Sequence, residues 1–485
     1  MRNPATLIDA YKADHRRQYP DGTENVYSNF TPRTSRIPEI DKVVFLGLQF
    51  FLQKFLMEEY GNFFAGDIDA ECARYERRMN TFLGPNDIGS EHIRALHKLG
   101  YLPLTFSAVP EGTQVPLRVP MVVVEATDER FGWLVNYMET LMSSVIWMPC
   151  TSATTAMRLR ELLVDYAVGT GSPIEFVDWQ GHDFSFRGMA GPEAASLSAI
   201  GHLVAFTGTD TIPAIDLIED YYGDNAEQYL IGGSVAATEH SVMCAGGADD
   251  ERETFRRLID LYPSGILSVV SDTWNLWNVI ENILPSLYDE IMARDGKLVI
   301  RPDSGDPVAI ISGDPNAEPG TPEYKGVIEL LWDIFGGTTT DEGYRILDSH
   351  IGAIYGDSIT YDRAERILAN LQAKGFASAN IVFGVGSYTY QFTTRDTFGF
   401  AMKATWVQIN GEGMPIYKDP VTDNGTKKSA KGRLAVLEVD GDLVLVDGAT
   451  PEQENESALV EVWRDGDFVE GGRTTFADIR ARARA

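Results

Sequence analysis

The chain of 485 residues carries 41 basic and 71 acidic side chains, which leaves a formal charge of −30 at pH 7. So negative a field repels nucleic acid and anionic membranes, and a phosphorylated substrate must meet a locally basic site or a bound cation. Hydrophobic residues make up 44% of the chain, enough for the packed cores of two or three domains.

Cysteine usage and the apolar runs bear on the compartment. Cys72, Cys150 and Cys244 form no CxxC pair, a pattern typical of a reducing cytoplasm. No signal-peptide core begins the chain, and no run of about 18 apolar residues could span a bilayer. We therefore expect a soluble cytoplasmic protein.

The N-terminal third mixes two kinds of element. Residues 45–61 have the apolar spacing of an amphipathic helix, and residues 119–126 form a strand-like run rich in valine. This part of the chain therefore predicts a mixed α and β region.

The middle of the chain repeats one pattern. Short apolar runs rich in β-branched residues end in a polar residue or glycine, and helical spacing follows most of them, for example over residues 273–294. The runs span residues 267–272, 297–303, 351–357 and 379–387. Strands alternating with helices predict a parallel sheet, with polar residues gathered at the carboxyl ends of its strands. An irregular βα-barrel is favoured; an open doubly wound sheet stays possible, and a single aspartate after a strand can simply cap a helix.

The C-terminal part predicts two β-hairpins. Residues 434–448 and 460–472 each alternate apolar and polar side chains around an Asp-Gly turn. We therefore expect an α/β protein in three segments: a mixed segment 1–149, a catalytic barrel 150–400, and a segment 401–485 that completes a β-rich flanking domain with the first.

Several short motifs carry groups suited to substrate binding. Phe184 could stack on a planar ring while Arg187 grips a phosphate, although such neighbours are more often core and surface residues. Asp210 precedes a helix, where a capping role is the simpler interpretation. Arg301 and Asp303 follow a strand and suit an anion beside a sugar diol or Mg²⁺.

The absence of two further sequence motifs argues against a histidine metal site and a serine hydrolase. The histidines show no HExxH or paired-ligand spacing, and no GxSxG elbow indicates a serine hydrolase. Taken alone, His240 among small apolar residues is most simply a core histidine. A lysine-rich run, residues 422–433, is a solvated loop or a polyphosphate-binding loop in a chain otherwise strongly acidic.

Taken in order, these motifs resemble the nicotinamide phosphoribosyltransferases, a family of type II phosphoribosyltransferases. The resembling stretches run from residue 9 to about 434 and include DAYKADHRRQYPDGT, HDFSFRG, GTDT, EHS, SVVSD, IRPDSGDP, YGD, FGVGS with TTRD, and KDPV with KKSAKGR. The resemblance implies an irregular α/β barrel with a β-rich domain, assembled as a homodimer with shared active sites.

The resemblance also implies the reaction. Nicotinamide and 5-phosphoribosyl-1-pyrophosphate would give nicotinamide mononucleotide and pyrophosphate in NAD salvage, with Mg²⁺ as cofactor and ATP as co-substrate. The nicotinamide site would consist of Phe184, Arg187, Asp210, Ser268 and Tyr11 of the partner subunit. His240 would be phosphorylated by ATP, and Glu239, Asp272 and Asp303 would complete the catalytic set.

Phosphate and ribose binding is implied for a larger set of residues. These are Arg33, Ser234, Arg301, Gly356, Asp357, Gly386, Ser387, Arg395 and Lys403, with Lys427, Lys428 and Lys431 forming the ATP or polyphosphate loop. Mg²⁺ would be held through the substrate phosphates, with Asp303 or Asp357 as the protein ligand.

One position departs from the family pattern. Ser387 stands in the FGVGSYTY turn where familiar members have glycine, so it could narrow the phosphate site or donate an extra hydrogen bond. Two alternatives remain: a nicotinate phosphoribosyltransferase, against which the Asp210 carboxylate argues, and a non-catalytic binding protein on the same fold, against which the retained charges of Arg301, Asp303 and His240 argue.

Overall fold

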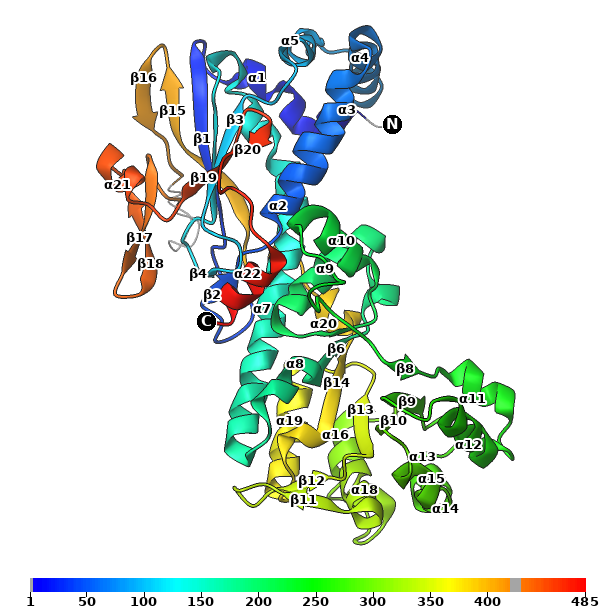
Figure 1. Ribbon diagram of the computed structural model, residues 1–485. Coiled ribbons are helices and arrows are strands. Elements are labelled where there is room, and N and C mark those ends of the chain that lie inside the picture. The colour runs from blue at the N-terminus through cyan, green and yellow to red at the C-terminus, as the bar shows by residue number, and fades with distance from the viewer. Residues whose placement is uncertain (1–2, 419–428) are drawn as a thin grey trace. The chain divides into compact units, whose positions relative to one another are not determined.

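The computed structural model describes residues 3–418 and 429–485 (Figure 1), and the chain divides into two compact units. Unit 1 comprises residues 1–154, 216–225 and 393–485, and unit 2 comprises residues 155–215 and 226–392. Both chain ends thus belong to one unit; the domain limits expected after residues 149 and 400 stay a prediction. Within the described ranges, no helix combines the length and apolar character needed to cross a membrane.

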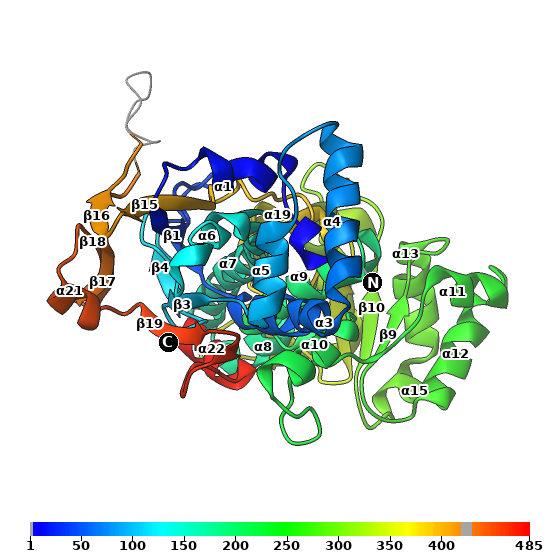
Figure 2. The ribbon, with the colours of Figure 1, turned by 90° about the horizontal axis from the view of Figure 1, so that it is seen from above.

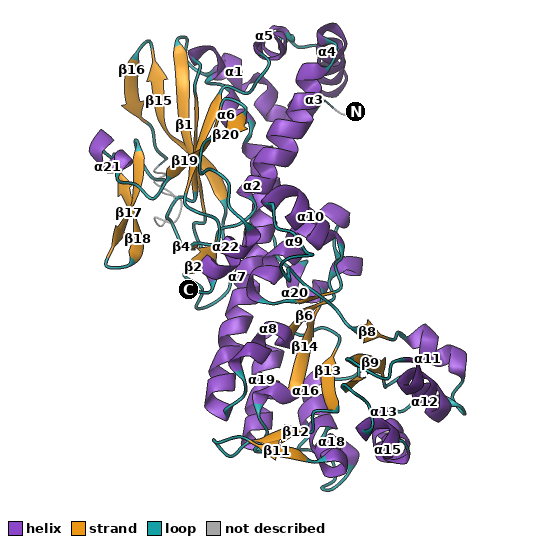
Figure 3. Ribbon diagram, viewed as in Figure 1, coloured by secondary structure: helices purple, strands orange, loops and turns teal. Residues whose placement is uncertain are grey.

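Unit 1 is built on an antiparallel sheet, drawn in orange in Figure 3. Its strands, in spatial order, are β16 (Glu412–Pro415), β15 (Ala401–Ile409), β1 (Thr23–Thr31), β5 (Val122–Ala126), β3 (Leu104–Ala108), β19 (Val460–Arg464) and β20 (Asp467–Phe468). The valine-rich run predicted as a strand is β5, which pairs with β1 and β3. The sheet joins strands from both ends of the chain, as the sequence predicts.

Both predicted hairpins are confirmed. Strands β17 (Leu434–Val439) and β18 (Asp442–Asp447) pair antiparallel, as do β19 and β20. The turn residues Asp440 and Gly441 have φ of 54° and 87°, and Asp465 and Gly466 have φ of 50° and 100°. Positive φ at both central residues is what a tight hairpin turn requires, so the Asp-Gly pairs specify these turns locally.

Helices pack on this sheet through aromatic residues. The predicted amphipathic helix is confirmed as α2 (Leu48–Phe51), a π-helical segment (Leu52–Glu59) and α3 (Tyr60–Ala65) in succession. Phe51 of α2 lies 6.2 Å, ring centre to ring centre, from Phe106 of β3, which lies 5.6 Å from Trp463 of β19. All three rings are fully buried. Other elements of unit 1 include α1 (His15–Gln18), α4 (Ile68–Leu83), α5 (Glu91–Leu99), α6 (Leu134–Tyr137), β2 (Lys42–Val44), β4 (Gln114–Pro116), α21 (Pro451–Asn455) and α22 (Phe476–Ala483).

Unit 2 contains a curled parallel sheet whose strands follow chain order. They are β6 (Gly181–Asp183), β7 (Gly208–Thr209), β8 (Ala236–Ala237), β9 (Leu267–Val270), β10 (Leu298–Arg301), β13 (Ile351–Tyr355) and β14 (Ile381–Val385). Strand β14 pairs with β6, and a parallel bridge between Gly208 and Gly233 joins β7 to the segment just before β8. The expected irregular βα-barrel is confirmed as a curled half-barrel, whose end strands β7 and β8 do not pair with each other.

Helices surround this sheet, with α11 and α12 beside β9 in both views (Figures 1 and 2). The helices of unit 2 include α8 (Val177–Gln180), α9 (Pro192–Ala205), α11 (His240–Gly246), α12 (Glu251–Leu261), α16 (Pro307–Ser312), α17 (Pro322–Lys325), α18 (Val327–Phe335), α19 (Tyr361–Ala373) and α20 (Ser387–Tyr390), and a small hairpin, β11 (Gly337–Thr339) with β12 (Arg345–Leu347), follows α18. Helices α7 (Glu139–Thr170) and α10 (Pro213–Tyr222) have residues in both units.

The helical spacing over residues 273–294 forms a broken helix rather than a continuous one. It consists of α13 (Leu276–Asn278), a π-helical turn (Val279–Ile283), α14 (Leu284–Ser286) and α15 (Tyr288–Met292). Pro285 lacks the N–H that would continue the helical ladder, so the segment breaks around it.

Parallel pairing brings all seven strand ends to one edge of the sheet. Phe184, Asp210, Asp272, Asp303 and Asp357 each follow the last residue of a strand by one or two positions. Because the strands run the same way, these side chains meet at the carboxyl edge, where barrels of this class keep their chemistry.

Candidate active site

One group of polar and aromatic side chains lies where β6 and β7 end. Nε2 of His182 and Oδ1 of Asp210 are 2.9 Å apart, and the Ser234 hydroxyl donates to the same oxygen at 2.5 Å. The Phe184 ring lies 4.5 Å from the His182 ring, and the Arg301 guanidinium lies 5.9 Å from the Phe184 ring centre. The group therefore offers an aromatic face beside a carboxylate, which suits a planar ring bearing a polar substituent.

A buried aspartate fixes the two loops that carry this group. Asp183 is fully buried, and its carboxylate accepts hydrogen bonds of 3.0 Å from the Ser185 backbone N–H and from the Thr209 hydroxyl. Its backbone carbonyl accepts the N–H of Asp210 at 3.0 Å. Phe184 and Asp210 are thus tied to a common buried residue, which holds their relative positions.

The protonation state of Asp210 reflects these contacts. Burial opposes ionisation, but hydrogen bonds from His182 and Ser234 and the positive charge of Arg301 outweigh it and lower the pKa of Asp210. Asp210 is therefore an ionised hydrogen-bond acceptor at neutral pH.

A second group combines a histidine with two carboxylates. Nε2 of His240, at the start of α11, lies 3.7 Å from Oδ2 of Asp303, and a guanidinium nitrogen of Arg301 lies 3.8 Å from the same oxygen. One ligand atom from each of His240, Asp272 and Asp303 lies within 4.8 Å of the others. The structure thus brings together four predicted site residues from two strand ends, those of β9 and β10, and one helix, α11.

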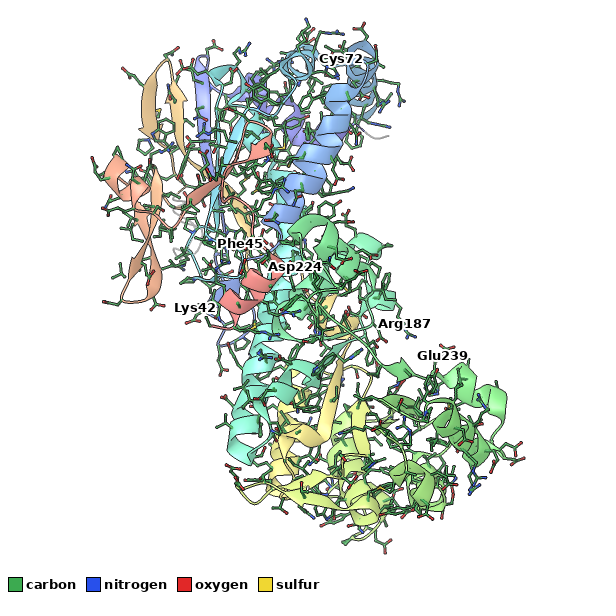
Figure 4. All side chains as sticks on the ribbon, viewed as in Figure 1. Lys42, Phe45, Cys72, Arg187, Asp224 and Glu239 are labelled. Carbon is green, nitrogen blue, oxygen red and sulfur yellow. The ribbon has the colours of Figure 1, made fainter. Side chains whose placement is uncertain are left out.

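The immediate partner of the His240 ring was not foreseen from the sequence. Nδ1 of His240 lies 3.1 Å from the hydroxyl of Thr273, whereas the Glu239 carboxylate accepts a hydrogen bond from the Ser241 hydroxyl. Thr273 is thus the partner of the His240 ring in this structure, and the orienting role expected for Glu239 stays a prediction. Figure 4 labels Glu239 at the exposed surface of unit 2.

Asp272 shapes the turn that carries Asp303. One of its oxygens accepts the backbone N–H groups of Asp303 and Ser304 at 2.9 and 2.8 Å, together with the Ser304 hydroxyl. The other oxygen, Oδ1, stays available within the site. Asp272 is thus both a structural cap and a second carboxylate beside Asp303.

Several buried polar atoms at this edge have no hydrogen-bond partner within the described part of the chain. They are Oγ of Ser268, Oδ1 of Asp272, Nε of Arg301 and Oδ1 of Asp303. Buried polar atoms are normally paired, so a group of unpaired ones indicates a place for a polar ligand or ion. Carboxylate oxygens are the ligands that Mg²⁺ prefers, so Asp272 and Asp303 fit a bound Mg²⁺.

The carboxyl groups also influence one another. Burial raises the pKa of Asp303, the negative charges of Asp272 and Asp357 add to this, and Arg301 and His240 only partly oppose it. A cation bound here would relieve that repulsion and favour the ionised form.

The rim of the site comes from the remaining strand ends. Asp357 after β13 and Arg187 after β6 are exposed, and Figure 4 labels Arg187 at the surface of unit 2. A Cβ atom on Gly188 would lie 2.0 Å from the Ser387 hydroxyl, so the extra side chain of Ser387 lies against Gly188. A Cβ on Gly386 would meet nothing within 4 Å, which leaves that turn open. At Gly356 the nearest atom would be Cδ of Arg301, at 3.5 Å.

Unit 1 contains a basic cavity of about 480 Å³. Its described lining includes the basic residues Arg33, Arg118, Arg395, Lys403 and Lys418 and one carboxylate, that of Asp447. Arg33, Arg395 and Lys403 were named from the sequence, whereas Arg118 and Lys418 were not. Burial lowers the pKa values of Arg33 and Lys403, and neighbouring positive charges contribute to the lowering. Such crowded cations suit an anionic ligand.

The structure describes some of the other site residues predicted in unit 1 and leaves others outside its described ranges. Tyr11 is 61% exposed, and the ammonium group of Lys12 lies 5.4 Å from the centre of its ring. The ammonium group of Lys431 lies 4.9 Å from the centre of the Tyr417 ring. Lys427 and Lys428 lie outside the described residues.

Comparisons with known proteins give matches over nearly the whole chain. Residues 179–477 match the model of the nicotinate phosphoribosyltransferase (NAPRTase) family, and residues 3–63 match the nicotinamide phosphoribosyltransferase N-terminal domain. A nicotinamide phosphoribosyltransferase of Acinetobacter baylyi is 53% identical over 99% of this chain and 97% of its own length. One of Mycoplasma pneumoniae is 38% identical over 88% and 94%.

Solved structures share the fold at low identity. A nicotinate-nucleotide pyrophosphorylase of Pyrococcus furiosus matches with a TM-score of 0.61 at 15% identity, over 99% of this chain and 94% of that one. Human nicotinic acid phosphoribosyltransferase matches with a TM-score of 0.58 at 17% identity, over 99% and 93%. At such identities the likeness concerns the fold.

Proposed function

Because this chain belongs to the nicotinate phosphoribosyltransferase family, with curated relatives named nicotinamide phosphoribosyltransferase, we propose that it transfers the phosphoribosyl group of 5-phosphoribosyl-1-pyrophosphate to nicotinamide. The products are nicotinamide mononucleotide and pyrophosphate. The observation that carries the choice of base is Asp210, a carboxylate with a lowered pKa. It contacts the His182 ring, which lies 4.5 Å from the Phe184 ring.

The charge of Asp210 favours an amide over an acid. An ionised carboxylate accepts a hydrogen bond from a carboxamide N–H but repels the carboxylate of nicotinate. Phe184, together with Tyr11 of the partner subunit, would hold the ring flat, and Arg187 would bind the amide oxygen or the product phosphate. Ser268, with an unpaired buried hydroxyl, completes the binding site on the β9 side.

The carboxylates at the strand ends suit the chemistry at the sugar. The ring nitrogen of nicotinamide forms a bond to C1 of the ribose as the bond from C1 to the pyrophosphate oxygen breaks, and the departing pyrophosphate takes the bonding electrons. Positive charge develops on the ribose in such a displacement. Asp303, with Asp272 and Asp357, would stabilise that charge and bind the ribose hydroxyls, while Arg301 and the open turn at Gly386 would contact phosphate.

Magnesium would be held through the substrate phosphates with Asp303 or Asp357 as the protein ligand, and Asp272 lies close enough to Asp303 to contribute a further oxygen. When bound, the ion neutralises charge on the departing pyrophosphate. The basic cavity of unit 1 is the proposed binding place for the remaining phosphates.

His240 is proposed to couple ATP hydrolysis to the reaction. A proton on Nδ1, donated to the Thr273 hydroxyl, leaves the lone pair of Nε2 free to attack the γ-phosphorus of ATP. ADP departs with the bonding electrons, and water later hydrolyses the phosphohistidine to free phosphate.

Two measurements test these roles. Purified protein with nicotinamide, 5-phosphoribosyl-1-pyrophosphate and Mg²⁺ should form nicotinamide mononucleotide, and the absence of product with and without ATP would refute the activity. γ-Labelled ATP should leave an acid-labile label on His240. His240→Ala should abolish ATP stimulation while some ATP-independent synthesis remains; His350→Ala, which alters a histidine before β13, is the matched control.

We also propose a homodimer with shared active sites, in which Tyr11 and the basic cavity of one subunit serve the barrel of the other. Asp303→Asn and Tyr11→Ala subunits, each inactive alone, should recover activity when mixed, because one of the two sites in a mixed dimer is then intact. No recovery after verified subunit exchange would contradict the shared site.

A further inference from the structure

Asp210 receives both of its side-chain donors on one oxygen. His182 and Ser234 both contact Oδ1, at 2.9 and 2.5 Å, and no described residue donates to Oδ2. The carboxylate is therefore held by one end, and the other end remains free to accept a hydrogen bond from a ligand.

The fold holds the His182 ring closely. His182 is 8% exposed and lies in β6 beside β7, where a Cβ atom on Gly208 would come within 2.7 Å of Nδ1. Glycine at position 208 therefore leaves room for the imidazole. On its other side the ring meets Phe184, with 40° between the ring planes.

The charge of Asp210 sets the direction of its hydrogen bond with His182. Asp210 is ionised, so it can only accept, and Nε2 of His182 carries the proton. The other titratable groups facing this pair are Asp183 at the end of β6, Arg301 of β10 and His202 of α9. Burial lowers the pKa of His202 to about 4, which keeps that ring neutral near pH 7.

We propose that His182 is a positioning residue that, together with Ser234, sets the preference for nicotinamide over nicotinate by holding the Asp210 carboxylate in place through Oδ1. The inference rests on the proposed function and deepens it. Without these donors the Asp210 carboxyl gains freedom to rotate and takes up a proton more readily. A protonated Asp210 can donate to a carboxylate, so nicotinate becomes a better substrate as nicotinamide becomes a worse one.

The test is the ratio of kcat/KM values for the two bases. In His182→Ala we expect kcat/KM for nicotinamide to fall about tenfold or more, mainly through KM, because hydrogen bonds to a charged group contribute at that level. The value for nicotinate should stay level or rise. Ser234→Ala should move the ratio in the same direction, and His182→Gln, whose amide N–H can replace the lost donor, should recover most of it.

A double-mutant cycle shows whether His182 acts through Asp210. In an Asp210→Ala background, His182→Ala should change the ratio no further, since coupled residues are not additive. His350→Ala removes a histidine whose Nδ1 lies 2.6 Å from Asp348 before β13, and should leave the ratio unchanged. Thermal unfolding of each variant identifies any that do not fold.

Two results would overturn the proposal. Equal losses for both bases would indicate that His182 merely supports the Phe184 ring, and additive effects with Asp210→Ala would indicate direct contact with substrate. Failure of the unaltered protein to make nicotinamide mononucleotide would instead refute the proposed function itself, so the two failures are distinguishable.

Discussion

The carboxyl edge of the barrel and the basic cavity of unit 1 carry opposite charge. At the barrel edge Asp210, Asp272, Asp303 and Asp357 gather with few cations among them. The cavity of unit 1 has five basic side chains in its described lining and the carboxylate of Asp447. In a chain with a net charge of −30, so basic a cavity is a local exception that suits an anion.

The same contrast appears in the ionisation of the two regions. At the barrel edge, burial and like charges raise the pKa of Asp303; in the cavity, burial and like charges lower the pKa values of Arg33 and Lys403. The charged forms of Asp303 in one region and of Arg33 and Lys403 in the other are thus disfavoured until a ligand of opposite charge is bound. The proposed substrate, with a cationic transition state at the sugar and an anionic leaving group, needs both.

The largest expected effect comes from the acidic region. Asp303→Asn should lower kcat/KM by about a thousandfold, as removal of a preorganised charge at a reacting centre does. The fall in kcat/KM is measured from the steady-state rate of nicotinamide mononucleotide synthesis. Asp341→Asn, in the exposed turn between β11 and β12, is the control, and equal activity of the two variants would contradict the role of Asp303.

The basic region should give a smaller effect. Arg395→Ala should raise KM for 5-phosphoribosyl-1-pyrophosphate about tenfold, because one charge-assisted contact to phosphate is lost. Arg464→Ala, which breaks the surface ion pair with Glu461 in the same unit, serves as the control. An unchanged KM in Arg395→Ala would indicate that the cavity does not bind this substrate.

Lowering the pH should weaken ligand binding at the barrel edge more than ligand binding in the basic cavity. Because the pKa of Asp303 is raised, its ionised form is lost at a higher pH than for an ordinary aspartate, and affinity for the Mg²⁺ complex of the substrate falls as pH drops through that raised pKa. The loss should approach about tenfold per pH unit below it. Calorimetric titration over a pH series measures this affinity, and Asp303→Asn should bind weakly with a flatter profile.

The buried carboxyl group of Glu251 belongs neither to the barrel edge nor to the basic cavity. It should therefore affect only the stability of the folded protein. Burial raises the pKa of Glu251, at the start of α12, to about 7, and its Oε1 has no partner within the described residues. Its protonated form is favoured by folding, so stability is lost as pH rises from the ordinary carboxyl range through about 7. Glu251→Gln should therefore raise unfolding free energy by about 1 kcal/mol at pH 8 but not at pH 4. Equal changes at both pH values would contradict this.

Local sequence patterns were sufficient for the elements that depend on neighbouring residues. The Asp-Gly turns of the two hairpins and the β-branched runs ending at Asp272, Asp303 and Asp357 could be predicted because turn conformation and strand alternation are encoded over a few residues. The ordered motifs also named most residues of the candidate site, and their roles stay a prediction. The helical spacing of residues 273–294 did not predict the break around Pro285.

The contacts that tune the site could not be predicted in this way. His182 with Asp210, His240 with Thr273, and Arg118 and Lys418 with the other cations of the cavity are each separated by more than ten residues, and no local pattern links them. The bridge from Gly208 of β7 to Gly233 is a further contact of this kind. The sequence by itself determined which residue types stand at the strand ends. Only the tertiary structure decided which atoms meet there, because parallel strand pairing joins distant segments whose spacing along the chain carries no information about register.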